Sequence, residues 1–300
     1  MAFQTGSAND VYDLLSQLRS FIATLGWTEN AWNGTDTLQV SNGTSYWNLK
    51  AVDNVDANSA SISDFDAAHP GIVVKGSTGF DGGSAWDAQP NDPGTDTALG
   101  VFTETDVPFY WFFGDAGYVH VVARIRAERY THLQLGDLVK IGTWTGGQYL
   151  AGTVIAADDG NADALSFSGS FRDGSATIRA DIDGLTNAWQ NTGGGGSTRF
   201  CRGAFEAAAQ AGNLMGHLAA AAPNDWNGRS PMWPLLMMLD RTGSADSYSI
   251  AGYPADMRYL NIRFIEPEET VVVGADEWLV FPHMIKTQND FGGFAYRKVS

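Results

Sequence analysis

The chain has 300 residues, of which 44% are hydrophobic and 12% aromatic, so it is long enough to bury a sizeable core and too apolar to be disordered. Its 34 acidic residues against 18 basic ones give a formal net charge of −16, which opposes binding to nucleic-acid phosphates and anionic lipid headgroups. The single cysteine, Cys201, excludes a disulfide within the chain.

The N-terminal residues have neither the basic nor the apolar region of a signal peptide. No apolar run reaches the ~18 residues that a membrane-spanning helix needs. We therefore expect synthesis in a cytoplasm and no membrane span.

Apolar residues at helical spacing predict one amphipathic helix near the N-terminus. Ser7 is the expected N-cap, with Asp10 three residues on, and Gly26 is the expected left-handed stop. The stripe consists of Val11, Leu14, Leu15, Leu18, Phe21, Ile22 and Leu25. We expect this stripe to pack either on the protein's own sheet or on a neighbouring subunit.

Residues 28–100 are rich in Asn, Asp, Gly and Ser around short apolar islands, of which 44–52 and 71–75 are the best candidate strands. Residues 78–97 predict a loop of about 20 residues. A loop of that length is usually a functional or contact loop.

The middle of the chain predicts a meander of four or five strands with one face buried. An apolar run at 108–113 is followed by an alternating run at 118–126, in which Val119 and Val121 point one way and His120 and Val122 the other. Further strands are predicted at 130–135, 138–144 and 148–153.

The last part of the chain predicts more strands and one weak helix. Segments 164–171 and 176–182 predict a hairpin around Asp173-Gly174. Gly193–Gly196 is a candidate boundary, and the Ala-rich segment 204–222 is a candidate helix. A pair of strands at 257–265 and 270–273, then strands at 278–282 and 292–299, complete the prediction.

These patterns predict a mainly β fold, with an antiparallel β-sandwich or barrel-like core and an N-terminal amphipathic α-helix. The expected division is a leader and helix at 1–27, a β-rich domain at 28–192, and a C-terminal β-rich region at 197–300 that either stands apart or belongs to the same domain.

Two groups of residues imitate metal sites. Asp159, Asn161 and Asp163 match the start of a calcium loop, but position six is Ala164 and position twelve is Ser170, so an EF-hand is rejected. A looser calcium site stays open as an alternative to solvated turns. His120 and His132 with Glu128 could bind zinc, but histidines at a surface or an interface are the favoured interpretation.

Two other groups suggest binding surfaces. Arg124, Arg126 and Arg129 predict either a docking patch for an acidic partner or a solvated strand face. Loop tryptophans suggest a sugar-stacking surface, with core and interface filling as the favoured alternative. These tryptophans are Trp27, Trp32, Trp47 and Trp86.

The sequence contains no G-x-S-x-G and no H-E-x-x-H motif, and Gly193–Gly196 lacks the Lys of a phosphate loop. We therefore assign no catalytic, cofactor-binding or metal-ligating residue and expect no enzyme and no cofactor.

Three stretches together resemble a family of tailed-bacteriophage virion proteins. They are 3–27, a Thr-Gly leader and helix before Gly-Trp; 118–152, with Gly-Asp-Leu-x-Lys-x-Gly and Trp-Thr-Gly-Gly; and 252–298, ending in Gly-Phe-Ala-Tyr-Arg-Lys. The resemblance lies in the residue types of these stretches and in their order along the chain. None of the stretches is a chemical motif.

The resemblance implies a structural component of the tail, baseplate or neck, made in the bacterial host cytoplasm and built into the virion. Its implied partners are copies of itself in a symmetric ring or trimer and other phage tail or neck proteins. A carbohydrate-binding or host-receptor-contacting module at the tail tip is the alternative, and a polysaccharide-degrading enzyme is a third hypothesis.

Overall fold

The computed structural model of the protein describes most of the chain. The described residues are 1–43, 45–54, 70–92, 99–103, 106–152, 154–155, 165–166, 176–181, 188–191, 198–200, 223, 228–240, 248–282, 286 and 292–298.

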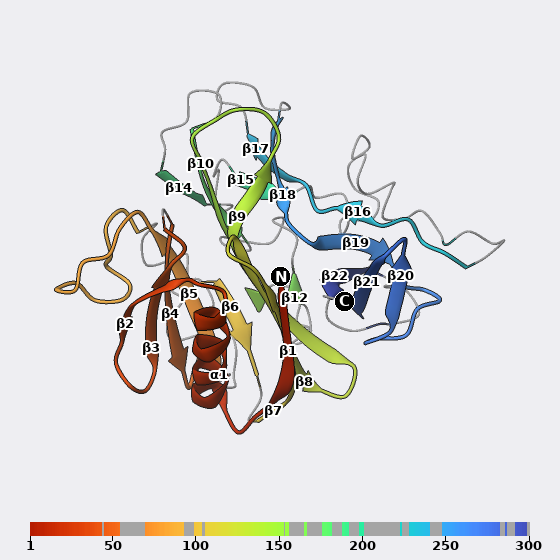
Figure 1. The fold of residues 1–300 in the computed structure, drawn as a ribbon, viewed down its shortest axis with the longest axis horizontal. Helices are drawn as coiled ribbons and strands as arrows, with labels where there is room; N and C mark the ends of the chain where they lie inside the picture. The colour runs from red at the N-terminus through yellow and green to blue at the C-terminus, as the bar shows by residue number, and fades with distance from the viewer. Residues whose placement is uncertain are drawn as a thin grey trace.

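A large antiparallel sheet, the central sheet, runs through the middle of the molecule (Figure 1). Its main path is β1 (Ala2–Ala8), β7 (Val107–Gly114), β8 (Tyr118–Arg126), β9 (Arg129–Lys140), β10 (Gly146–Gly152), β13 (Ala176–Ala180) and β14 (Ala188–Asn191). The end of β9 also pairs with β18 (Tyr248–Pro254), which leads to β17 (Met237–Asp240) and β15 (Thr198–Phe200).

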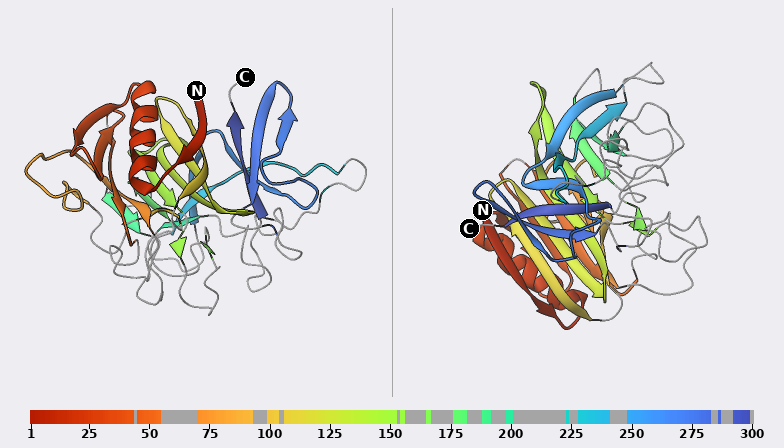
Figure 2. Two further views of the ribbon diagram at one scale, coloured as in Figure 1. Left: turned by 90° about the horizontal axis from the view of Figure 1, so that it is seen from below. Right: turned by 90° about the vertical axis from the view of Figure 1, so that its right-hand side faces the viewer.

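Two five-stranded sheets lie on either side of the central sheet (Figures 1 and 2). The N-terminal sheet has the order β2 (Thr28–Trp32), β3 (Thr37–Ser41), β4 (Tyr46–Val52), β5 (Gly71–Ser77) and β6 (Leu99–Phe102). The C-terminal sheet has the order β16 (Trp233–Pro234), β19 (Met257–Asn261), β22 (Gly292–Lys298), β21 (Asp276–Pro282) and β20 (Thr270–Val273). A separate pair joins β11 (Val154–Ile155) to β12 (Leu165–Ser166).

Alternating side chains of the central sheet divide the core into two clusters. Tyr110 and Phe112 of β7 pack towards the N-terminal sheet, whereas Trp111 and Phe113 pack towards the C-terminal sheet. The predicted mainly β, sandwich-like fold is thus confirmed, and the described strands do not close into a barrel. The prediction that the meander buries one face is wrong, because each neighbouring sheet covers one of its faces.

The helix α1 (Val11–Thr24) is confirmed, but its cap differs from the prediction. Asp10 is the N-cap: its carboxylate accepts a hydrogen bond of 2.8 Å from the Asp13 N–H. Ser7 belongs to β1, so residues 2–8 form a strand of the central sheet rather than a leader. Gly26 has φ +80° and is the left-handed stop that the sequence predicts.

The apolar stripe of α1 packs inside its own chain. Its buried residues join side chains of β4, β5 and β7 in the larger cluster. The alternative in which this stripe docks on a neighbouring subunit is therefore wrong. No helix in the described part of the chain has both the length and the apolar character needed to cross a bilayer.

Several strand pairings differ from the prediction. Residues 130–140 form one strand, β9, rather than two. The strand β13 pairs with β10 and β14, and most of segment 164–171, its predicted hairpin partner, lies outside the described residues. The strand β19 is separated from β20 by β22 and β21. The Gly193–Gly196 segment, the candidate helix at 204–222 and the calcium-loop residues Asp159, Asn161 and Asp163 lie outside the described residues.

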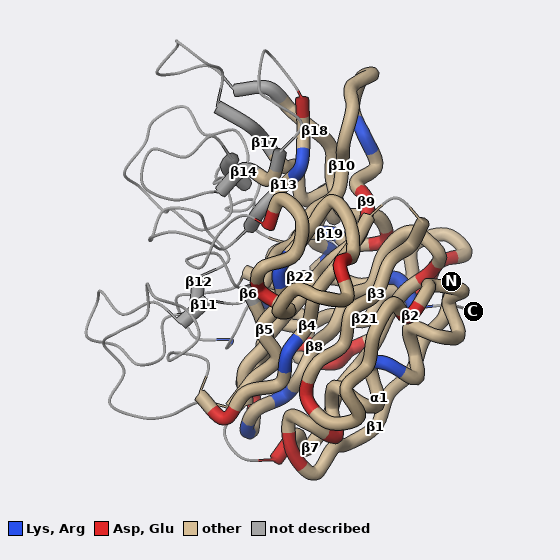
Figure 3. The backbone as a smooth tube through the Cα atoms, turned by 90° about the vertical axis from the view of Figure 1, so that its left-hand side faces the viewer, with Lys and Arg blue, Asp and Glu red and all other residues tan. Residues whose placement is uncertain are grey.

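The pairing between β9 and β18 joins the predicted region 28–192 to region 197–300. The two ends of the described chain also meet, because the Lys298 Nζ lies 5.6 Å from the centre of the Phe3 ring. Lys and Arg are interspersed with Asp and Glu over the side of the molecule drawn in Figure 3.

Candidate functional site

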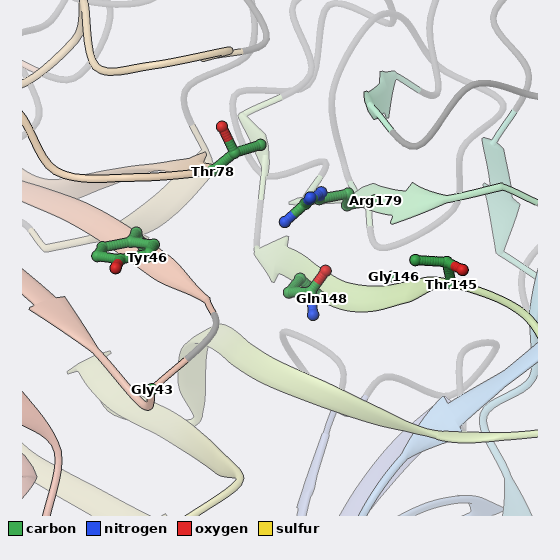
Figure 4. Close-up of a pocket in the computed structure, with 7 residues that line it drawn as sticks. All are labelled: Gly43, Tyr46, Thr78, Thr145, Gly146, Gln148 and Arg179. Carbon is green, nitrogen blue, oxygen red and sulfur yellow. The ribbon is translucent and has the colours of Figure 1, made fainter.

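A polar pocket of about 470 Å³ lies between the N-terminal sheet and the central sheet (Figure 4). Its size is typical of sites that take small ligands. Residues of both sheets, far apart in the sequence, line it: Gly43, Tyr46, Thr78, Thr145, Gly146, Gln148 and Arg179.

Two of the polar side chains, Gln148 and Arg179, lie on the same side of the central sheet, beside a β-bulge. The register of β10 on β13 passes from Gly146–Ala180 to Tyr149–Ile178, so Gly147 and Gln148 face the single residue Arg179. Figure 4 shows the Gln148 and Arg179 side chains extending into the same space.

Gly146 is required for this arrangement. It has φ +98°, and a Cβ atom there would lie 2.2 Å from the Arg179 carbonyl oxygen. The close approach of β10 and β13 at the bulge therefore depends on a glycine at this position.

The amide of Gln148 is oriented by Asp137, which lies opposite it on β9. The Asp137 carboxylate accepts hydrogen bonds from Gln148 Nε2 (3.3 Å), Ser45 Oγ (3.1 Å) and Asn42 Nδ2 (2.7 Å). An ionised carboxylate only accepts, so the Gln148 nitrogen must face Asp137 and its oxygen must face away. Gln148 is 7% exposed, and its buried Oε1 has no donor among the described residues.

A second feature is an exposed apolar edge on the C-terminal sheet. β20 is the last strand of the described sheet and pairs with β21 alone. The side chains of Val272 and Val273 are 57% and 51% exposed, whereas Val271 packs on the apolar cluster of the sheet. An edge strand with apolar side chains is a template for pairing with another chain.

The two candidate zinc ligands are core residues. His120 and His132 are 0% exposed and face the C-terminal sheet, so the surface or interface interpretation is wrong. His120 Nε2 lies 2.8 Å from the Ala255 carbonyl oxygen. His132 lies 2.9 Å from the Tyr296 hydroxyl and 3.0 Å from the Pro282 carbonyl oxygen.

The remaining zinc candidate, Glu128, lies apart from the two imidazoles. It is exposed, with φ +63°, between β8 and β9, and is not buried with them. The described residues contain no group of three or more His, Cys, Asp or Glu that could hold a metal ion.

Arg124, a member of the predicted arginine patch, pairs within the chain. Its guanidinium donates a hydrogen bond of 2.8 Å to Glu268 and lies 4.7 Å from the centre of the Phe109 ring. Glu268 also accepts a hydrogen bond of 2.7 Å from the Tyr130 hydroxyl. Part of the proposed docking patch therefore holds the C-terminal sheet on the central sheet.

The four tryptophans of the sugar-stacking hypothesis do not form one surface. Trp27 and Trp47 are 6% and 0% exposed and stack on each other inside the core, with ring centres 4.9 Å apart. Trp32 and Trp86 are partly exposed and lie beside Arg19 and Lys75 respectively. The core-filling interpretation is thus confirmed for Trp27 and Trp47.

The sequence analysis did not identify Gln148, Arg179 or Tyr46. The only local signal was the glycine pair Gly146-Gly147, which the sequence places in a turn and the structure places at the bulge. Compared with known proteins, the chain matches no family model and no curated protein.

Proposed function

We propose that this protein is a structural component of a tailed-bacteriophage virion, in the tail, baseplate or neck. It would act by protein–protein assembly rather than by catalysis. Its partners would be copies of itself in a symmetric ring or trimer and other tail or neck proteins, after synthesis in the bacterial host cytoplasm.

The arrangement of the three stretches that carry the resemblance supports this proposal. The first forms β1 and α1, the second forms β8 to β10, and the third includes β18 to β22. The second and third stretches pair directly through β9 and β18. The resemblance therefore concerns elements that belong to one connected framework.

The observation that carries the assembly proposal is the apolar edge strand β20. One edge of β20 has no partner strand among the described residues and can accept a strand from another chain, and exposed Val272 and Val273 add apolar area to such a contact. Repeated contacts of this kind close into a ring when the rotation between copies allows it.

The test is the mass of the purified full chain in solution, measured by light scattering with and without EDTA. We expect a discrete trimer or hexamer, and we expect Val272→Lys to shift it towards monomer because a lysine on an edge strand opposes strand addition. The fold should tolerate this change, since Val272 lies opposite Glu277 on β21.

The matched control is Ile141→Lys, which removes an apolar side chain that is 45% exposed away from β20. It should leave the mass unchanged. An oligomer that survives Val272→Lys would refute the role of β20, and a wild-type monomer at every concentration would refute self-assembly. Loss of the oligomer in EDTA would reveal a structural metal.

A further inference from the structure

We propose that the polar pocket binds a neutral saccharide residue, with Gln148 Oε1 accepting a hydrogen bond from a sugar hydroxyl. This inference is independent of the assembly proposal. The pocket is formed by the N-terminal and central sheets, whereas the apolar edge strand β20 belongs to the C-terminal sheet.

The Gln148 amide has a fixed orientation. Its nitrogen is held by Asp137, and its buried oxygen lacks a donor among the described residues. A buried acceptor without a donor is costly, so a ligand that brings an O–H group to this atom gains more than it would at an exposed amide. Asp137 also keeps the amide from rotating, since a carboxylate cannot face the amide oxygen.

The pocket is lined by hydrogen-bond donors as well as acceptors. Arg179 carries guanidinium donors, and Thr145 is an exposed hydroxyl residue at the rim that can donate and accept. The Thr78 hydroxyl already contacts the Pro90 carbonyl oxygen and Asn91 Nδ2. A site that offers both acceptors and donors suits a ligand rich in hydroxyl groups, because each hydroxyl of the ligand can donate one hydrogen bond and accept others.

The charged groups around the pocket disfavour an anionic ligand. The positive Arg179 lines the pocket, and the negative Asp137 lies behind Gln148. A phosphate or carboxylate ligand would place its negative oxygens against the amide oxygen and close to Asp137, which is unfavourable. A neutral, hydroxyl-rich ligand avoids this repulsion.

The pocket has an aromatic residue in its lining and room for a small ligand. The half-buried Tyr46 stands across the pocket from Gln148 and Arg179 (Figure 4). An aromatic ring offers an apolar face for the C–H groups of a sugar ring, while its polar end stays wet. The volume of about 470 Å³ lies within the range of small-ligand sites.

The test is an array of immobilised glycans that includes neutral hexoses, deoxyhexoses, N-acetylhexosamines and acidic sugars, probed with the labelled full chain. We expect binding to a subset of neutral glycans. Gln148→Leu and Arg179→Met should each weaken that binding about tenfold or more, as loss of a polar contact to a buried group predicts.

The matched control is Gln17→Leu, the same chemical change on α1, outside the pocket. It should bind as the wild type does. Gln148 also donates a hydrogen bond to Asp137, so Gln148→Leu could disturb the fold around Asp137. Tyr46→Leu leaves the hydrogen bonds of Asp137 intact and is therefore measured beside Gln148→Leu. The melting temperature of each variant is recorded as a check on folding.

Three outcomes would overturn the proposal. They are no neutral glycan bound above background, binding restricted to acidic sugars, and neutral binding that persists in Gln148→Leu, Arg179→Met and Tyr46→Leu but is lost in Trp32→Ala or Trp86→Ala. The last result would place the sugar on the exposed tryptophans instead.

Discussion

At the scale of single residues, His120 is a buried imidazole in a setting that disfavours its charged form. Its Nε2 carries the proton, since it faces the Ala255 carbonyl oxygen, and its Nδ1 has no partner among the described residues. Burial lowers the pKa of His120 to about 4, although the hydrogen bond to Ala255 and the Asp256 carboxylate act in the opposite direction. The charged and titratable groups on this side are Tyr118, Asp256, Tyr296 and Arg297.

This depressed pKa predicts a loss of stability in acid. Between pH 6.5 and about 4 the unfolded state binds the proton and the folded state does not, so the free energy of unfolding falls as the pH falls. The loss approaches about 3 kcal/mol at the low end of that window. Above pH 6.5 the imidazole is neutral in both states and contributes no pH dependence.

Urea unfolding across this pH window checks the prediction. His120→Phe keeps a planar ring beside Tyr118 and Tyr296 but cannot titrate, so its free energy of unfolding should fall less steeply with acid than that of the wild type. The carboxylates titrate in both proteins and cancel in the comparison. Equal slopes in the two proteins would show that His120 is not the responsible group.

At the scale of elements, α1 anchors the contact between the N-terminal sheet and the central sheet. Leu18 is 0% exposed and belongs to the larger core cluster. We expect Leu18→Ala to lower the free energy of unfolding by about 2–5 kcal/mol, because the cavity cannot collapse fully between two sheets. Ser20→Ala, on the exposed side of the same helix, should change it by about 0.5 kcal/mol or less.

Chemical denaturation of the two variants provides the measurement. Similar losses for Leu18→Ala and Ser20→Ala would contradict the packing described for α1. We also expect Leu18→Ala to leave the oligomeric state unchanged, because the apolar stripe of α1 is buried in the core of its own chain.

The elements that the sequence predicted well are those whose signal is local. The stripe of α1 and the alternation of β8 each lie within about fifteen consecutive residues, and both are confirmed. Strand neighbours are not local: β22 pairs with β19 and β21, while β13 pairs with β10. Sequence spacing alone could not reveal these pairings.

The prediction for His120 and His132 was wrong for the same reason, because their burial depends on distant parts of the sequence. Their alternation placed them correctly on one face of β8 and β9, but their polarity favoured a surface or interface position. The C-terminal sheet that covers this face is built from residues more than 100 positions later. Likewise, the pocket needs Tyr46, Gln148 and Arg179 from three strands, and the sequence offers no pattern that joins them.

At the scale of the whole molecule, the three sheets depend on one another. The long strand β9 pairs with β8, β10 and β18, so one strand belongs to both halves of the sequence. The Tyr296 hydroxyl of β22 also contacts His132 Nδ1 at 2.9 Å and accepts a hydrogen bond of 2.7 Å from Gln134 Nε2. The C-terminal sheet thus completes the polar and apolar environment of the central sheet.

This dependence predicts that region 28–192 is not an independent folding unit. A fragment of residues 1–192 would expose Trp111, Phe113 and Val122, which the C-terminal sheet covers in the intact chain. We expect the fragment to bind a hydrophobic dye and to unfold without a cooperative transition in urea, whereas the intact chain unfolds in a single step. Co-expression with residues 197–300 should restore cooperative unfolding, because the β9–β18 pairing and the Tyr296 contacts can then form between the fragments. Cooperative unfolding of fragment 1–192 alone would instead show that the central and N-terminal sheets form a domain of their own, onto which the C-terminal sheet docks.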